Sequence, residues 1–139
     1  MDAAELKRRT FQFGVRVVNL VRALPKTVEA RAVGAQLVRS GTAVGANYRA
    51  SCKARSKAEF VAKVGIVEEE TDESACWLEM IIATEMLKSS RVDPLLRESR
   101  ELERIFGKSR VTASRSLKVA GGSSHRQLAI GSRQSDNRQ

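Results

Sequence analysis

The chain has 139 residues, of which 42% are hydrophobic and only 4% are aromatic. This length suits one compact domain, and an aliphatic-rich, aromatic-poor composition favours helices over a β-sandwich or barrel. The single histidine, His125, stands in a Gly/Ser-rich stretch near the end. Histidine-dependent catalysis and most transition-metal sites are therefore not expected.

Charge is distributed unevenly along the chain. The formal net charge is +9, yet residues 6–63 carry 13 basic and two acidic side chains, whereas residues 64–103 carry 11 acidic and four basic ones. The basic half could attract phosphate groups, or it could meet the acidic half within the fold or on a neighbouring subunit. The charge pattern is compatible with both interpretations at once.

Three features of the sequence bear on the cellular compartment of the protein. Residues 1–9 are charged and lack an apolar core, so we expect no signal peptide. No apolar run approaches the roughly 18 residues of a membrane span, so no membrane partner is expected. Cys52 and Cys76 lack a CxxC spacing and are predicted to be free thiols. These features together predict a cytoplasmic protein.

Two helices are predicted in the basic half. From about residue 5 to residue 24, apolar side chains recur every three or four positions, and Pro25 ends the helix; they are Phe13, Val17, Leu20, Val21 and Leu24. The second helix, from about residue 28 to residue 54, contains Gly41 and Gly45. A glycine inside a helix costs about 1 kcal/mol relative to alanine. Their spacing therefore predicts a close crossing with another helix.

A third helix is predicted from Ser56 to about Lys88. Ser56 and Glu59 have the spacing of a capping box. Apolar and small polar residues then follow at alternating steps of four and three, the rhythm of a bundle seam; they are Phe60, Val64, Val67, Thr71, Ser74, Leu78 and Ile81. The polar Thr71 and Ser74 are expected to set the register of the helices rather than to add stability.

A fourth helix is predicted to begin with Asp93 as its N-cap and Pro94 at its first position. It carries Leu95, Leu102, Ile105 and Phe106 and is expected to fade between residues 107 and 116. Residues 117–139 show no periodicity and are predicted to form a disordered, weakly basic tail. Because the connections are short, we predict an all-α fold: an antiparallel up-down-up-down four-helix bundle over residues 1–116.

Three segments of the chain match a known pattern in combination. They are 34–49 (GAQLVRSGTAVGANYR), 54–60 (ARSKAEF), and 70–73 (ETDE) with 77–79 (WLE). Over about residues 8–115 the chain resembles the four-helix-bundle proteins encoded in intervening sequences of bacterial 23S ribosomal RNA genes. The resemblance implies a similar bundle and subunits of cyclic homopentamers. Structural relatives of that family include the accessory protein of diversity-generating retroelements, a basic pentamer that binds a reverse transcriptase and nucleic acid. Nothing from residue 117 onward matches the pattern.

The acidic segment at residues 68–73 could suggest a metal site, but carboxylate sites in bundles also use Glu-x-x-His pairs, and the predicted helices contain no histidine. We instead expect ion pairs between its carboxylates and arginines of the second helix, or a solvated face; the pairing residues are Arg39, Arg49, Glu70, Asp72 and Glu73. Neither the serines nor the cysteines have a histidine base, and no phosphate-binding loop occurs. We therefore predict no catalytic residues, no cofactor and no small-molecule substrate.

Basic residues remain as the candidate functional feature. The predicted nucleic-acid-binding residues are Arg49, Lys53, Arg55 and Lys57 around the turn between the second and third helices, with Arg8, Arg9 and Arg16 on the first. Binding of this kind would involve mostly phosphate and would be salt-dependent. Tyr48 and Phe60 fall on apolar stripes, so no exposed aromatic platform for base stacking is expected.

These observations lead to one interpretation and one alternative. We predict a non-enzymatic homo-oligomer, a ring of five subunits, that binds RNA or a nucleic-acid-processing protein electrostatically. The alternative is a protein-only scaffold whose basic and acidic faces serve subunit assembly.

Overall fold

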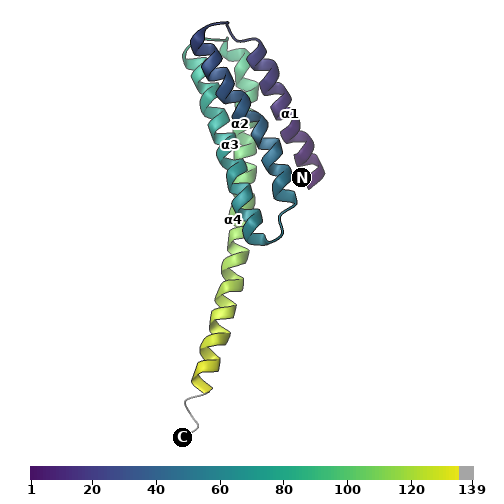
Figure 1. Ribbon diagram of the computed structural model, residues 1–139, viewed down its shortest axis with the longest axis vertical. Coiled ribbons are helices and arrows are strands. Elements are labelled where there is room, and N and C mark those ends of the chain that lie inside the picture. Colours follow the sequence, from purple (N-terminus) through teal and green to yellow (C-terminus); the bar gives the residue numbers. More distant parts are fainter. Residues whose placement is uncertain (135–139) are drawn as a thin grey trace.

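The computed structural model describes the backbone of residues 1–134 and the side chains of residues 1–121. These residues form four α-helices and no strand: α1 (Ala3–Arg22), α2 (Val28–Cys52), α3 (Lys57–Ala83) and α4 (Ser89–Gln134). Each helix packs against the next in sequence, and α4 returns to α1, so the helices surround one core with alternating directions (Figure 1). The predicted all-α antiparallel bundle is confirmed. Within residues 1–134, no helix combines the length and the apolarity that a bilayer crossing requires.

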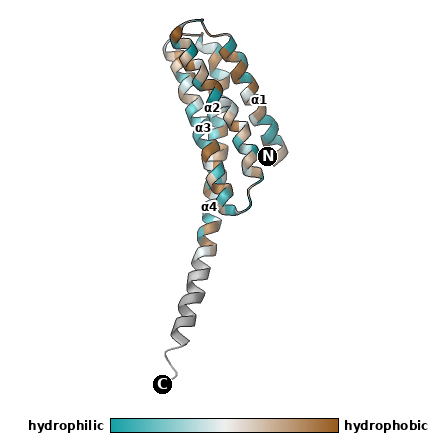
Figure 2. Ribbon diagram, in the orientation of Figure 1, coloured by the Kyte–Doolittle hydropathy of each residue, from teal (hydrophilic) through white to brown (hydrophobic). Residues whose placement is uncertain are grey.

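The core is built from the apolar stripes of all four helices. Phe13 on α1, Leu37 on α2, Leu78 on α3 and Leu102 on α4 are each at most 1% exposed. Burying a side chain of this size contributes about 1.5–3 kcal/mol. Hydrophilic residues lie between the hydrophobic ones along every helix of the bundle (Figure 2), which is the pattern of helices with one buried face.

Helices α1 and α2 approach closely at glycines. A methyl group on Gly41 would lie 2.7 Å from a Cγ atom of Val17, and one on Gly45 would lie 3.3 Å from the backbone carbonyl of Thr10. On α1, a methyl group on Gly14 would lie 3.6 Å from the carbonyl oxygen of Gly41. The predicted close crossing is therefore present, and its partners on α1 are the side chain of Val17 and the backbone at Thr10.

A layer of hydroxyl groups crosses the core between α2, α3 and α4. The Ser74 hydroxyl donates to the Ser40 hydroxyl at 2.8 Å, and the Ser99 hydroxyl donates to the carbonyl of Thr71 at 2.6 Å. All four residues are completely or almost completely buried. Shifting one helix by a turn would break the hydrogen bonds between helices and leave the buried Ser99 hydroxyl without its acceptor, so the layer favours a single register.

Helix α3 ends earlier than the sequence pattern predicts. The expected end was near Lys88, but the helix stops at Ala83 because Glu85 adopts a left-handed backbone with φ of 58°. The N–H of Met86 then donates to the carbonyl of Ile81, which closes a Schellman motif. This motif usually has glycine at the left-handed position, so a glutamate there gave no signal.

Helix α4 also begins earlier than predicted. It starts at Ser89, so Asp93 is not its N-cap and Pro94 lies inside the helix rather than at its first position. The missing N–H of Pro94 removes one intrahelical hydrogen bond near the start of the helix. Val92 and Leu95 on either side are buried in the core, at 0% and 3% exposure, and hold this first part of α4 against the bundle.

The C-terminal part of α4 extends beyond the other three helices (Figure 1). The predicted fading of the helix between residues 107 and 116 is not observed, because α4 continues to Gln134 and no proline follows Pro94 to interrupt it. Ala113 is nevertheless the last buried side chain among residues 1–121. The domain boundary at residue 116 and the disorder of the tail stay predictions. Residues 135–139, and the side chain of His125, lie outside the described part.

Candidate nucleic-acid interface

Arg9 joins α1 to α4 in an ion pair. Its Nε donates to a carboxylate oxygen of Glu98 at 2.9 Å, and its Nη2 lies 2.6 Å from the other oxygen and 2.9 Å from Glu101. The hydrogen bonds to Glu98 raise the pKa of Arg9, against the opposing effect of burial. Arg9 was predicted to meet nucleic acid, but its guanidinium is already engaged by two carboxylates, whereas the neighbouring Arg8 is exposed.

Arg39 on α2 meets the acidic segment of α3. Its guanidinium lies 3.3 Å from Glu70 and also pairs with Glu73. The structure therefore brings together three of the residues predicted to form ion pairs. Asp72 is exposed and has no cation within 4 Å among the residues described, and Arg49 lies elsewhere.

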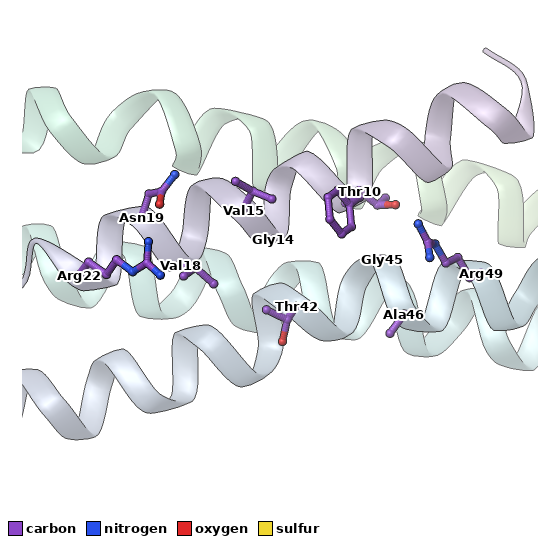
Figure 3. Close-up of a pocket in the computed structure, with 11 residues that line it drawn as sticks. Thr10, Gly14, Val15, Val18, Asn19, Arg22, Thr42, Gly45, Ala46 and Arg49 are labelled. Atoms are coloured by element: carbon purple, nitrogen blue, oxygen red, sulfur yellow. The ribbon is translucent and has the colours of Figure 1, made fainter.

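Arg49 lies in a groove between α1 and α2. Its guanidinium carbon is 5.7 Å from the ring centre of Phe11, a cation–π contact. The groove has a volume of about 510 Å³ and runs along the close crossing, where Gly14, Gly45 and Ala46 line it with little side chain. Figure 3 shows Arg49 and Arg22 toward opposite ends of this groove, with the small and apolar residues between them.

Three further predicted cations surround the turn between α2 and α3. Lys53 caps the end of α2, Arg55 lies in the turn, and Lys57 begins α3. The Lys57 ammonium donates to the hydroxyl of Ser116 at 2.7 Å, which ties this turn to α4 at the point where α4 leaves the bundle. All three cations are exposed, and none has a carboxylate within 4 Å in residues 1–121.

The helix cap at this turn is built almost as predicted. The Ser56 hydroxyl accepts from the N–H of Glu59 at 3.1 Å, as a capping box requires. The Glu59 carboxylate accepts from the N–H of Arg55 at 2.9 Å, one residue before the expected donor, and lies 3.2 Å from Lys63. The hydrogen bond from Arg55 lowers the pKa of Glu59. The turn is thereby fixed with its basic side chains facing solvent.

Arg16 faces a different side of the molecule. It lines a shallow pocket between α1 and α4 together with Arg91. The seven predicted cations therefore do not form one surface. Arg49 and the three cations of the α2–α3 turn lie at the end of α2, whereas Arg9 is paired with carboxylates of α4 and Arg16 lies beside α4.

One aromatic residue in the groove escaped the sequence analysis. Phe11 is 55% exposed, so the prediction that no exposed aromatic accompanies the basic residues is wrong. A signal was present, because Arg8, Phe11, Val15, Val18 and Arg22 also recur at steps of three and four. This second stripe lies beside the core stripe of the same helix, and its three apolar members were not considered in the prediction.

The acidic residues of α3 do not assemble into a metal site in the described part of the chain. Residues 1–121 contain no group of three or more potential ligands close enough to hold an ion. Burial raises the pKa of Glu103, which lies near Glu68 and Asp72, while Glu68 itself is bonded by Arg110 at 2.6 Å. Cys52 and Cys76 are both exposed and unpaired, as predicted.

Comparison with known proteins agrees with this architecture. The profile of the family described as 23S rRNA-intervening sequence protein matches residues 3–108. The crystal structure of a protein of unknown function from the S23 ribosomal protein family of Bacteroides thetaiotaomicron is 33% identical. The match has a TM-score of 0.68 and covers 73% of this chain and 94% of that one. No curated protein matches the chain. The resemblance seen in the sequence is thus confirmed, and the chain belongs to the 23S rRNA-intervening sequence protein family.

Proposed function

We propose that this chain is a non-enzymatic, oligomeric RNA-binding protein that holds RNA, or an RNA-containing partner, by its phosphates. The subunits would form a ring of five in the cytoplasm, where exposed unpaired thiols such as Cys52 and Cys76 remain reduced. The binding residues would be Arg49, Lys53 and Arg55, with Lys57 and Arg8 beside them.

The observation that carries the proposal is the way ion pairs are distributed in residues 1–121. Carboxylates of α3 and α4 engage Arg9, Arg39, Arg100 and Arg110. Arg49, Lys53, Arg55 and Lys57 have no such partner in residues 1–121, and these four cations are gathered within residues 49–57, at the end of α2 and in the turn that follows it. Unpaired, exposed cations fixed on a short rigid turn are suited to phosphate, whose binding releases condensed counterions. A ring would repeat the same patch and strengthen its field.

The alternative function, a protein-only scaffold, is favoured by the segregation of charge between helices. A basic α1–α2 face and an acidic α3 face could pair between neighbouring subunits of a ring. In that case Arg49, Lys53 and Arg55 would serve assembly rather than RNA. The two functions differ in which property is lost when these charges are reversed.

The test is a triple reversal, Arg49→Glu, Lys53→Glu and Arg55→Glu, in nuclease-treated protein. RNA binding is measured by fluorescence anisotropy over a salt series, and oligomer mass by light scattering. The logarithm of the wild-type affinity should fall linearly with the logarithm of the salt concentration. In the triple variant the slope of this line should be smaller by about one phosphate contact for each reversed cation. Its oligomer should remain intact.

A matched control reverses three exposed cations at the opposite end of the bundle, Lys26→Glu, Arg31→Glu and Lys88→Glu. This variant has the same change in net charge, so it should retain the salt slope of the wild type. Equal loss in both variants would show only a general charge effect. Loss of the oligomer in the first variant alone would favour the scaffold, and absence of wild-type binding at about 50 mM salt would exclude the proposed function.

A further inference from the structure

We propose that the groove between α1 and α2 is a stacking site for unpaired bases, so that the nucleic acid bound is single-stranded. This inference rests on the proposed RNA binding and adds the class of RNA. Phosphate contacts alone carry no preference for single strands, whereas an exposed aromatic ring provides one, because a base must be unstacked from its neighbours to lie against it.

The ring of Phe11 has the exposure that stacking needs. It is 55% exposed although it lies in the middle of a helix that packs on two neighbours. Arg49 lies over it at 5.7 Å, which orients the ring and places a positive charge beside it. An arginine guanidinium is itself a plane on which bases stack. The pair therefore presents two stacking surfaces and one cation at the same point.

The rest of the groove is shaped for a flat, uncharged group. Beside the ring, Gly14, Gly45 and Ala46 leave room along the helix crossing, and Val15 adds an exposed apolar surface at 36% exposure. No acidic residue lines the groove. The groove lining therefore contains no negative charge that would repel the phosphates of a bound strand.

The two ends of the groove complement a sugar–phosphate backbone. Arg22 and Arg49 lie toward opposite ends of it (Figure 3), and neither has a carboxylate within 4 Å in residues 1–121. Phe11 and Arg22 are eleven residues apart on α1, or about 16 Å along the helix axis. An unstacked strand spans more per nucleotide than the roughly 3.4 Å of a stacked one, so this length accommodates at most a few nucleotides, which is still more than one phosphate.

The experiment compares three probes of equal length: an oligouridylate of about 12 nucleotides, an abasic sugar–phosphate strand, and an RNA duplex. Phe11→Ala should weaken binding of the oligouridylate about 5- to 150-fold, the range for losing one stacked base. Binding of the abasic strand and the duplex should change less than twofold. Phe11→Trp should restore oligouridylate binding, because any large aromatic ring can stack.

Ile66→Ala is the matched control, since it removes an apolar side chain of 44% exposure from α3, outside the groove. Equal effects of Phe11→Ala and Ile66→Ala, or equal losses for all three probes, would overturn the stacking site. An altered oligomer mass in Phe11→Ala with RNA affinity unchanged would also overturn it and assign the groove to a second copy of the chain. If wild-type protein binds the oligouridylate and only the triple charge reversal weakens it, the proposed function stands and this inference fails.

Discussion

The close contact of α1 and α2 at Gly41 can be tested by adding one methyl group. In Gly41→Ala, the new Cβ would lie 2.7 and 2.8 Å from the two Cγ atoms of Val17, where carbon atoms ordinarily stay about 3.5–4.0 Å apart. Val17 is fully buried and β-branched, so it cannot rotate away easily. We expect α1 to be pushed off α2 by close to 1 Å, with an overpacking cost of about 1–3 kcal/mol.

Alanine also stabilises a helix relative to glycine by about 0.5–1 kcal/mol, which would partly conceal that cost. Gly65→Ala on α3 is therefore the matched control, since its Cβ would be 3.5 Å from a methylene of Arg110, an ordinary contact. Both substitutions gain the same helix propensity. The difference between their free energies of unfolding should equal the overpacking cost alone, about 1–3 kcal/mol.

The assay is urea unfolding followed by circular dichroism, with all variants at one protein concentration because assembly would shift the transition. Gly41→Ala in a Val17→Ala background should cost less than in the wild type, because both Cγ atoms are gone and only the Cβ of residue 17, at 3.0 Å, remains close. If Gly41→Ala and Gly65→Ala are equally stable, the close crossing does not constrain this position and the reasoning fails.

Two further predictions concern partly buried charged groups. Arg9→Ala should lower the free energy of unfolding by about 1–3 kcal/mol, because it leaves the half-buried carboxylate of Glu98 without its donor. The control Arg8→Ala should change the free energy of unfolding by less than about 0.5 kcal/mol. Equal effects of the two substitutions in urea unfolding would contradict this prediction. Glu103 has a raised pKa, so the folded state binds its proton more tightly than the unfolded chain, and stability should fall as the pH rises from the ordinary value of 4.5 through the raised one. Glu103→Gln should remove that decline and stabilise the protein at neutral pH by up to about 0.5 kcal/mol, measured as thermal unfolding over a pH series; an unchanged pH profile would refute the assignment.

The fold could be predicted because it depends on the period of apolar residues. The core stripes and the glycine crossing are properties of spacing, and they are found where the sequence places them. The end of α3 and the start of α4 could not be predicted in this way. The end of α3 depends on the left-handed conformation of Glu85, and the start of α4 depends on buried neighbours that keep Pro94 inside the helix. Local backbone hydrogen bonds accompany the first feature, and the buried neighbours Val92 and Leu95 accompany the second.

The candidate interface was predicted less completely than the fold. Arg8 and Arg9 are neighbours of the same type, and only packing shows that one is paired with α4 while the other faces solvent. Phe11 does not belong to the apolar stripe predicted for the first helix, and a hydrophobic side chain beside such a stripe is not marked by its residue type as exposed or buried. Whether such a residue lies on the core stripe or beside it depends on a rotation of about one residue, which composition and period do not determine.

The hydroxyl layer has a consequence for how the groove can change shape. Ser40, Ser74 and Ser99 fix α2, α3 and α4 relative to one another through hydrogen bonds, and α1 contributes no group to this layer. Helix α1 is attached instead by apolar packing, the glycine contacts and the Arg9 ion pair. One wall of the groove is thus held by buried hydrogen bonds in addition to apolar packing, and the other by apolar packing and one ion pair. A change in the width of the groove would therefore require a displacement of α1, while the hydroxyl layer keeps the other three helices aligned.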